Sequence, residues 1–316
     1  MNINIKNIDA LQLLQSLDDK SVDLILTDPP YYKLLNVDWD NQWKTKEDYL
    51  IWLETIIKEC QRVLKDNGSF YMFCSAEMSW YVEGLIRKYF NVLNHIRWDK
   101  PIIANGKPCT ALTIKKESLR KWLSYSEEII FAEQFSQCIR CNGDTKGTLF
   151  SPIYSYLNSQ RIKRGFTIKR INELCGVKAR ANHYFGSHQF ELISEEHYTK
   201  LRKHMDLKPY DEIIAEYEAL HRTFKLTSDK PYNNTWCFKQ TPTRKGRHPC
   251  EKPEDLISHI IDASSNENDL VVDPFCGSCV VPKCCDKMNR RCIAGDLDDT
   301  YLNHQQYISC SSYHNI

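Results

Sequence analysis

The chain has 316 residues, with 42 lysines and arginines against 41 aspartates and glutamates, and 42% of its residues are hydrophobic. This composition excludes an intrinsically disordered chain, and the length suits one large domain or two smaller ones. The apolar runs are shorter than the ~18 residues that a membrane span needs, and residues 1–6 lack the apolar core of a secretory signal. We therefore expect a cytoplasmic protein with no membrane partner.

The 14 cysteines are spread along the chain. In a long chain without an export signal, free thiols are expected rather than a disulfide framework. Two CxxC pairs occur, Cys138 with Cys141 and Cys276 with Cys279. A zinc site would need both pairs to meet, and nothing in the sequence indicates that they do, so no metal is expected.

The near-zero net charge conceals three basic stretches, at residues 100–121, 160–205 and 239–252. The second stretch contains ten lysines and arginines but only four acidic residues. A single run of this kind usually marks a solvated surface. Three of them in a nearly neutral chain favour a polyanionic partner such as DNA.

Short apolar runs that end at turn residues alternate with helical patterns along most of the chain. Strands are predicted at 22–27, 69–74, 92–98, 128–132, 270–272 and 292–294, and helices at 49–64, 79–90, 254–264 and 280–288. The alternation indicates an α/β fold whose mostly parallel sheet carries helices on both faces. Between about residues 134 and 234 it gives way to a mainly helical, basic insert.

The first candidate motif is Asp28-Pro29-Pro30-Tyr31, directly after the predicted strand 22–27. The strand delivers an acid to its carboxyl end, where open α/β sheets bind ligands, and the two prolines stiffen the turn. Asp28 and the Pro29 carbonyl suit an exocyclic amine, and Tyr31 suits stacking on a planar ring. An ordinary surface turn is the alternative interpretation.

The second motif, Asp273 to Cys279, lies between a predicted strand and a predicted helix. A strand, a tight turn containing Gly277 and a helix N-terminus form the layout of a loop that binds a nucleotide-like cofactor. Asp296 follows about 20 residues later, at the end of the next predicted strand, where a carboxylate can bind ribose hydroxyls.

Within the insert, residues 167–185 resemble a helix-turn-helix with Gly176 at the turn. The second helix would present polar side chains to phosphates or base edges in a major groove. These candidate DNA-binding residues are Lys178, Arg180, Asn182 and His183. Two packed helices with a glycine between them are the alternative interpretation.

Together the motifs resemble those of the amino-methylating DNA methyltransferases. Residues 28–31 match their DPPY motif, 273–279 resembles their DPFxGSG loop, and 248–253 resembles an HPxxKP segment. Residues 7–11 and 98–101 resemble two further family segments. The catalytic motif precedes the cofactor loop, as in the circularly permuted β group.

The resemblance implies a Rossmann-like, circularly permuted methyltransferase fold. Its catalytic half would span 1–135, a helical target-recognition insert 136–235, and its cofactor-binding half 236–316. The implied activity is methyl transfer from S-adenosylmethionine to the N6 amine of adenine in double-stranded DNA after base flipping. The resemblance leaves open whether a cognate restriction endonuclease acts beside it and whether the enzyme is a monomer or a homodimer.

The resemblance also assigns roles to individual residues. Those implied to bind and activate the target amine are Asp28, Pro29, Pro30 and Tyr31. Those implied to bind the cofactor are Asp9, His248, Lys252, Pro253, Asp273, Phe275, Gly277, Ser278 and Asp296, with Asp9 on the adenine amino group and residues 248–253 over the methionine part. An initial aspartate in the catalytic motif resembles adenine-N6 enzymes, whereas serine is commoner in cytosine-N4 enzymes.

Cys279 departs from the family pattern, which has glycine there. Glycine permits close backbone approach and a positive φ, so cysteine is expected to weaken cofactor binding. Two alternatives to the adenine enzyme follow, a cytosine-N4 methyltransferase and a catalytically impaired homologue that only binds DNA. A nicotinamide-dependent oxidoreductase would share the sheet but give residues 28–31 no role.

Overall fold

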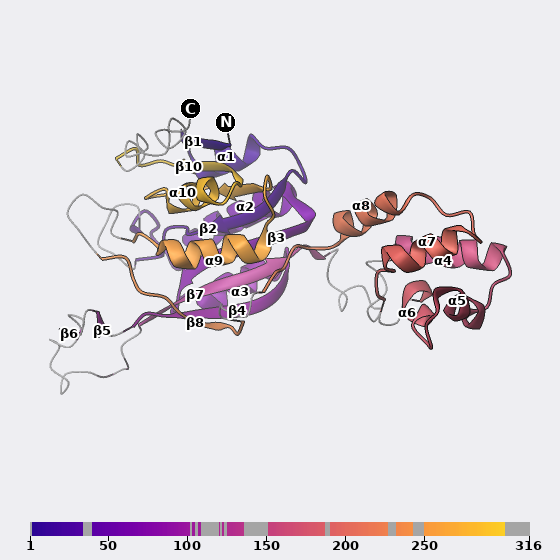
Figure 1. Ribbon diagram of the computed structural model, residues 1–316. Helices are drawn as coiled ribbons and strands as arrows, with labels where there is room; N and C mark the ends of the chain where they lie inside the picture. The colour runs from indigo at the N-terminus through magenta and orange to yellow at the C-terminus, as the bar shows by residue number, and fades with distance from the viewer. Residues whose placement is uncertain are drawn as a thin grey trace, which may run out of the picture. The chain divides into compact units, whose positions relative to one another are not determined.

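The fold is described from a computed structural model (Figure 1). The described residues are 2–33, 40–101, 103–104, 107–108, 120, 122, 125–135, 151–186, 190–226, 232–242 and 250–300. The chain forms two compact units, one made of residues 1–134 and 223–316 and the other of residues 135–222. Among the described residues, no helix is long and apolar enough to cross a membrane.

The first unit is built on an eight-stranded sheet in the order β1-β10-β9-β2-β3-β7-β4-β8. The strands are β1 (Ile3–Asn7), β2 (Val22–Thr27), β3 (Leu64–Ser75), β4 (Asn91–Asp99), β7 (Ser126–Glu133), β8 (Thr235–Cys237), β9 (Leu270–Asp273) and β10 (Arg291–Asp296). All neighbours pair in parallel except β7, which is antiparallel to both β3 and β4. A separate two-stranded pair joins β5 (Ile103–Ala104) to β6 (Lys107–Pro108). The predicted α/β class with a mostly parallel sheet is confirmed.

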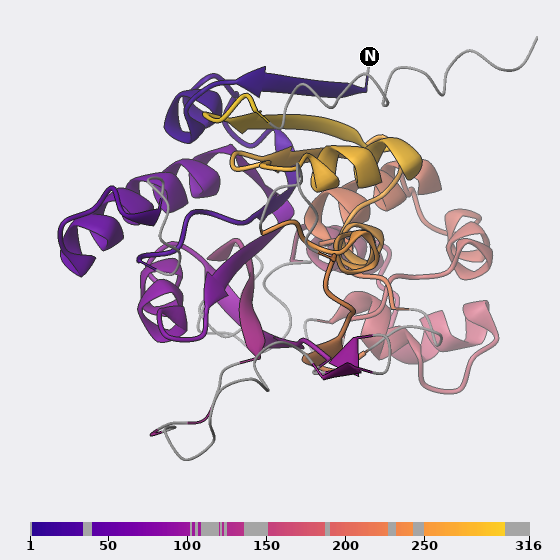
Figure 2. The ribbon, with the colours of Figure 1, turned by 90° about the vertical axis from the view of Figure 1, so that its left-hand side faces the viewer.

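Helices cover both faces of this sheet (Figure 2). The helices are α1 (Ala10–Gln15), α2 (Lys46–Val63), α3 (Ser79–Ile86), α9 (Glu254–Ser264) and α10 (Val280–Lys287). Phe70 and Met72 of β3 belong to the core under α1, α2 and α3. Their neighbours Tyr71 and Phe73 belong to the core under α9 and α10. Successive strand residues point to opposite faces, so one strand serves both cores.

The connection from α2 to β3 differs from the prediction. The sequence predicts a strand only at 69–74, but β3 begins at Leu64. Val22 pairs with Leu64 and Leu24 with Ser69, so residues 65–68 form an irregularity within the strand. A Cβ on Gly68 would lie 2.6 Å from Leu64 Cδ1, so a side chain at this position would clash with Leu64.

The second unit is helical and has its own core. Its helices are α4 (Ser151–Lys163), α5 (Ile168–Cys175), α6 (Ala181–Phe185), α7 (Glu195–Arg202) and α8 (Tyr210–Leu220). Apolar side chains from all five helices are buried together. Immediately after this unit the chain returns to the first one, where β8 pairs with β4.

Candidate functional site

A cavity of about 210 Å³ lies at the carboxyl ends of the parallel strands β2, β9 and β10. Asp28 follows β2, while Asp273 and Asp296 are the last residues of β9 and β10. All three line the cavity together with Gly277. The two motifs, which are about 245 positions apart in the chain, therefore share one pocket, as expected for an open parallel sheet.

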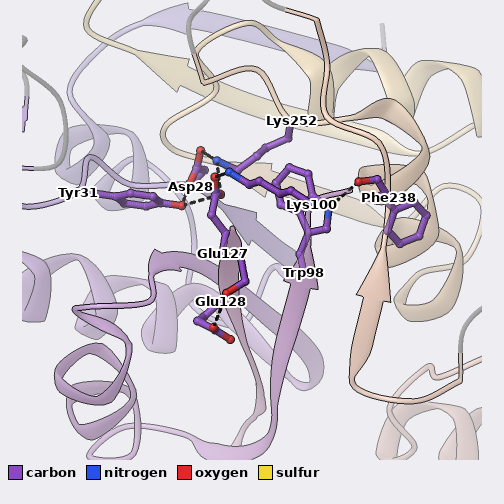
Figure 3. Close-up of polar contacts among 9 residues, drawn as sticks. Asp28, Tyr31, Trp98, Lys100, Glu127, Glu128, Phe238 and Lys252 are labelled. Carbon is purple, nitrogen blue, oxygen red and sulfur yellow. Dashed lines mark hydrogen bonds and ion pairs between the residues drawn. The ribbon is translucent and has the colours of Figure 1, made fainter. Parts of the chain in front are cut away.

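Asp28 accepts two hydrogen bonds on one wall of this cavity (Figure 3). Its Oδ1 accepts a bond from the Tyr31 hydroxyl at 2.7 Å, and its Oδ2 receives Lys252 Nζ at 2.5 Å. The backbone N–H of Tyr31 donates to Oδ1 of the buried Asp40 at 2.9 Å, which fixes the turn that the two prolines begin. This pocket wall therefore presents a carboxylate held from two sides.

The Tyr31 ring is only 8% exposed. Burial, and then the nearby Asp28 and Glu127 carboxylates, raise the pKa of the Tyr31 phenol well above its usual value. The hydroxyl therefore stays protonated and acts as a donor, in this structure to Asp28 and, at 3.3 Å, to Glu127.

Lys252 is 6% exposed and lies between two carboxylates. Its ammonium group is 2.5 Å from Asp28 Oδ2 and 3.1 Å from Glu127 Oε2. Burial lowers the pKa of Lys252, but Asp28 and Glu127 outweigh this effect and raise it above its usual value. Lys252 thus carries a permanent charge beside the first motif, and Pro253, the next residue, precedes α9.

Glu127 completes this cluster, although it belongs to none of the sequence motifs. Its Oε1 pairs with Lys100, while its Oε2 faces Lys252. Burial raises the pKa of Glu127, but Lys252 and Lys100 outweigh it and bring the pKa to about 2. The one signal in the sequence was a pair of acids, Glu127 and Glu128, directly before the apolar run of residues 129–132.

The loop after β9 is held by backbone bonds to carboxylates. The Gly277 N–H donates to Asp296 Oδ2 at 2.8 Å, and the Phe275 N–H donates to Asp273 Oδ1 at 3.2 Å. Gly277 has a φ of +43°, a conformation that glycine adopts without a Cβ clash. Burial raises the pKa of Asp273 well above its usual value. Phe275, Gly277 and Ser278 line the cavity.

Asp296 and Asp9 lie at the same cavity and also serve the backbone. Asp296 Oδ1 accepts a bond from the Asp298 N–H at 2.9 Å. Asp9 caps α1, since its Oδ1 accepts bonds from the N–H groups of Leu11 and Gln12 at 2.9 and 3.2 Å. Because a carboxylate has about four acceptor positions, both side chains keep capacity for a ligand.

Cys279 precedes α10 with a φ of +60° and a ψ of +28°. This is the left-handed region, which is unfavourable for residues with a Cβ. Its Sγ lies 3.8 Å from Cys276 Sγ, and both side chains are buried. The position that carries glycine in the family thus has the positive φ for which glycine is suited, and here a cysteine adopts it.

His248, Cys138 and Cys141 lie outside the described residues. Among the described residues, no group of three or more His, Cys, Asp or Glu side chains could hold a metal ion.

The helix-turn-helix prediction is wrong in the extent of its second helix. Gly176 ends α5 with a φ of +75°, but α6 starts only at Ala181, so Lys178 and Arg180 precede it, and Asn182 and His183 lie on it. The Asn172 side chain accepts a bond from the Ala181 N–H at 2.9 Å, which favours this later start. Lys178, Arg180 and Asn182 are exposed, and Arg180 pairs with Glu191.

Comparisons with known proteins match this chain to DNA methyltransferases. A protein-family model described as DNA methylase, of the N6/N4 type, matches residues 22–307. The DNA adenine methyltransferase YhdJ of Escherichia coli is 27% identical over 93% of this chain and 78% of that protein. The type II methyltransferase M1.MboII of Moraxella bovis is 25% identical over 96% and 95% of the two chains.

Solved structures of methyltransferases share the fold. The PvuII DNA methyltransferase (cytosine-N4-specific) has a TM-score of 0.57 at 14% identity and covers all of this chain and 88% of that one. The M1.HpyAVI complex with SAM has a TM-score of 0.53 at 18% identity, with 97% and 98% covered. Since the family model spans nearly the whole length, the chain belongs to the N6/N4 DNA methylase family.

Proposed function

We propose that this protein transfers a methyl group from S-adenosylmethionine to the N6 amine of adenine in double-stranded DNA. The observation that carries the proposal is the shared cavity: Asp28, Pro29 and Tyr31 line it from one side, and Phe275, Gly277 and Ser278 line it from the other. An amine and a methyl donor that bind these two walls would lie next to each other, as direct transfer requires.

The residues of the second wall fit S-adenosylmethionine chemically. Asp296 and Asp9 offer acceptor capacity for ribose hydroxyls and an adenine amino group, and Phe275 and Trp52 supply aromatic surface. Asp273, the last residue of β9, is a buried carboxyl group directly before this loop. When bound, S-adenosylmethionine supplies an electrophilic methyl group on a positively charged sulfur.

The first wall would hold and activate the amine. A base in a duplex must rotate out of the stack to reach a cavity of this kind. Asp28 and the Pro29 carbonyl accept hydrogen bonds from the amine, which orients its nitrogen lone pair and stabilises the positive charge that develops there. Because Tyr31 is largely buried, we assign its hydroxyl to holding Asp28 and only the exposed part of its ring to contact with the base.

Adenine is proposed as the target base on two grounds. The catalytic motif begins with aspartate at position 28, which resembles the adenine enzymes, and YhdJ is named as a DNA adenine methyltransferase. The nucleoside that is formed decides the question: after labelled-methyl transfer and enzymatic digestion of the DNA, N6-methyl-2′-deoxyadenosine is expected, and N4-methyl-2′-deoxycytidine would refute the choice of base. No labelled nucleoside of either kind would favour the impaired homologue.

Asp28→Ala is expected to lower the rate of methyl transfer by about 10²- to 10³-fold, because an acceptor aimed at the developing charge is lost. S-adenosylmethionine binding, measured by titration calorimetry, should change little. Asp66→Ala removes an exposed carboxylate that pairs with Lys20 at 3.0 Å and serves as the control. Normal transfer by Asp28→Ala would refute the role of this residue.

A further inference from the structure

The contacts of Lys252 conflict with the role of Asp28 as the acceptor for the amine. Asp28 Oδ1 accepts a bond from the Tyr31 hydroxyl, and the positively charged Lys252 ammonium lies 2.5 Å from Oδ2. The amine nitrogen gains positive charge as its bond to the methyl carbon forms and the bond from that carbon to sulfur breaks, until the nitrogen releases a proton to solvent. An ammonium group held on Asp28 would repel that charge.

Glu127 offers the same ammonium group a second acceptor. Glu127 Oε2 is 3.1 Å from Lys252 Nζ, so the ammonium can exchange one carboxylate for the other by a small movement of a flexible side chain. Because the pKa of Glu127 is about 2, this second acceptor is ionised at neutral pH. Lys252 is therefore never left as an unpaired buried charge, whichever carboxylate it favours.

Glu127 is held rigidly enough to act as a fixed acceptor. It lies on β7, where it is paired between Ser75 of β3 and Trp98 of β4. Its other oxygen pairs with Lys100, whose ammonium lies 5.0 Å from the centre of the Trp98 ring, and the Trp98 Nε1–H donates to the Phe238 carbonyl at 2.9 Å (Figure 3). By contrast, Asp28 lies beyond the end of β2, on the wall of the cavity.

We propose that Glu127 is a positioning residue for methyl transfer, which draws the Lys252 ammonium off Asp28 when the target amine arrives. The inference rests on the proposed function. Glu127 acts only through Lys252: it moves a positive charge away from Asp28 and from the reacting nitrogen.

The test is a double-mutant cycle with Glu127→Gln and Lys252→Met, read by single-turnover methyl transfer. Glu127→Gln keeps the size of the side chain but offers no anion, so Lys252 stays on Asp28 and the transfer rate is expected to fall about 30-fold. In the Lys252→Met background no ammonium occupies Asp28, so adding Glu127→Gln should change the rate less than about threefold. In each background, Glu127→Gln should leave the affinity for S-adenosylmethionine unchanged.

Glu128→Gln is the matched control, since Glu128 is the next residue of β7 and is also buried. Its Oε2 pairs with His95 Nε2 at 3.2 Å, and Figure 3 shows its side chain directed away from the cluster. The control should transfer methyl groups at the wild-type rate. Melting temperatures of all variants show that each one is folded.

The outcomes separate the inference from the function on which it rests. An active wild type together with an equal loss from Glu127→Gln in both backgrounds would overturn the inference, because Glu127 would then act independently of Lys252. An unaffected Glu127→Gln variant would overturn it as well, and the proposed function would stand in both cases. A wild type that methylates no DNA would refute the proposed function, and the inference with it.

Discussion

At the scale of single residues, the two motifs are held in place by different kinds of contact. Asp28 is held by neighbouring side chains, whereas the loop containing Gly277 is held by its own backbone bonds to Asp296 and Asp273. The shape of the loop thus depends on a few backbone angles. Cys279 has a positive φ, which is unfavourable for a residue with a Cβ.

A comparison of Cys279→Gly with Cys279→Ala isolates the cost of a Cβ at this position. Both variants remove the sulfur, but only glycine relieves the left-handed conformation. We expect the glycine variant to be the more stable of the two by about 1 kcal/mol in the free energy of unfolding, measured with urea. It should also bind S-adenosylmethionine more tightly. An alanine variant as stable as the glycine variant would contradict the assignment of strain.

The residues of the motifs could be identified from sequence because they are adjacent in the chain, where Pro29 and Gly277 carry visible backbone constraints. The partners of Asp28 could not be predicted in this way. Lys252 was expected over the methionine part of the cofactor; it lines the cavity, and its ammonium also contacts Asp28 and Glu127. That contact depends on the packing of β7 beside β3 and on the segment before α9, neither of which leaves a local pattern.

At the scale of elements, the period of the hydrophobic residues located most strands and helices but not their ends. β3 begins five residues earlier than predicted, because an irregular strand can include the polar residues 65–68. α6 starts later than predicted for a different reason: the Asn172 side chain accepts a hydrogen bond from the N–H of Ala181, the first residue of the helix. β1, α1 and β8 were not predicted, and β8 has only three residues, which are too few to show a period.

The position of Lys178 before α6 gives a prediction for DNA binding. Lys178→Ala is expected to weaken binding to duplexes of any sequence and to reduce the slope of log affinity against log salt by about one, as for a phosphate contact. Lys200→Ala is the control, because its ammonium pairs with Glu196 at 2.6 Å. Fluorescence anisotropy at several salt concentrations measures both, and an unchanged slope for Lys178→Ala would refute the contact.

At the scale of the whole molecule, the buried cluster links stability to pH. Glu127 has a pKa of about 2 in the folded chain against an ordinary value near 4.5. A lowered pKa stabilises the fold above the ordinary value, and this contribution is lost as the pH falls toward the folded value.

Glu127→Gln should therefore flatten the acid side of the stability curve. Between pH 6 and pH 3, the wild type is expected to lose about 2 kcal/mol more in free energy of unfolding than the variant does. Urea unfolding at each pH gives the difference, and Glu128→Gln serves again for comparison. Parallel curves for the wild type and Glu127→Gln would show that the cluster does not stabilise the ionised carboxylate.

The pairing of β1 with β10 has a consequence for biosynthesis. Ile3 lies opposite Cys292 and Asn7 opposite Asp296, so β1 pairs with a strand that is translated almost 300 residues later. Contacts so distant in the chain slow folding. During biosynthesis, β1 therefore stays without this partner until residues 291–296 have been translated, and Asp9 and Asp296 can meet at one cavity only from that moment.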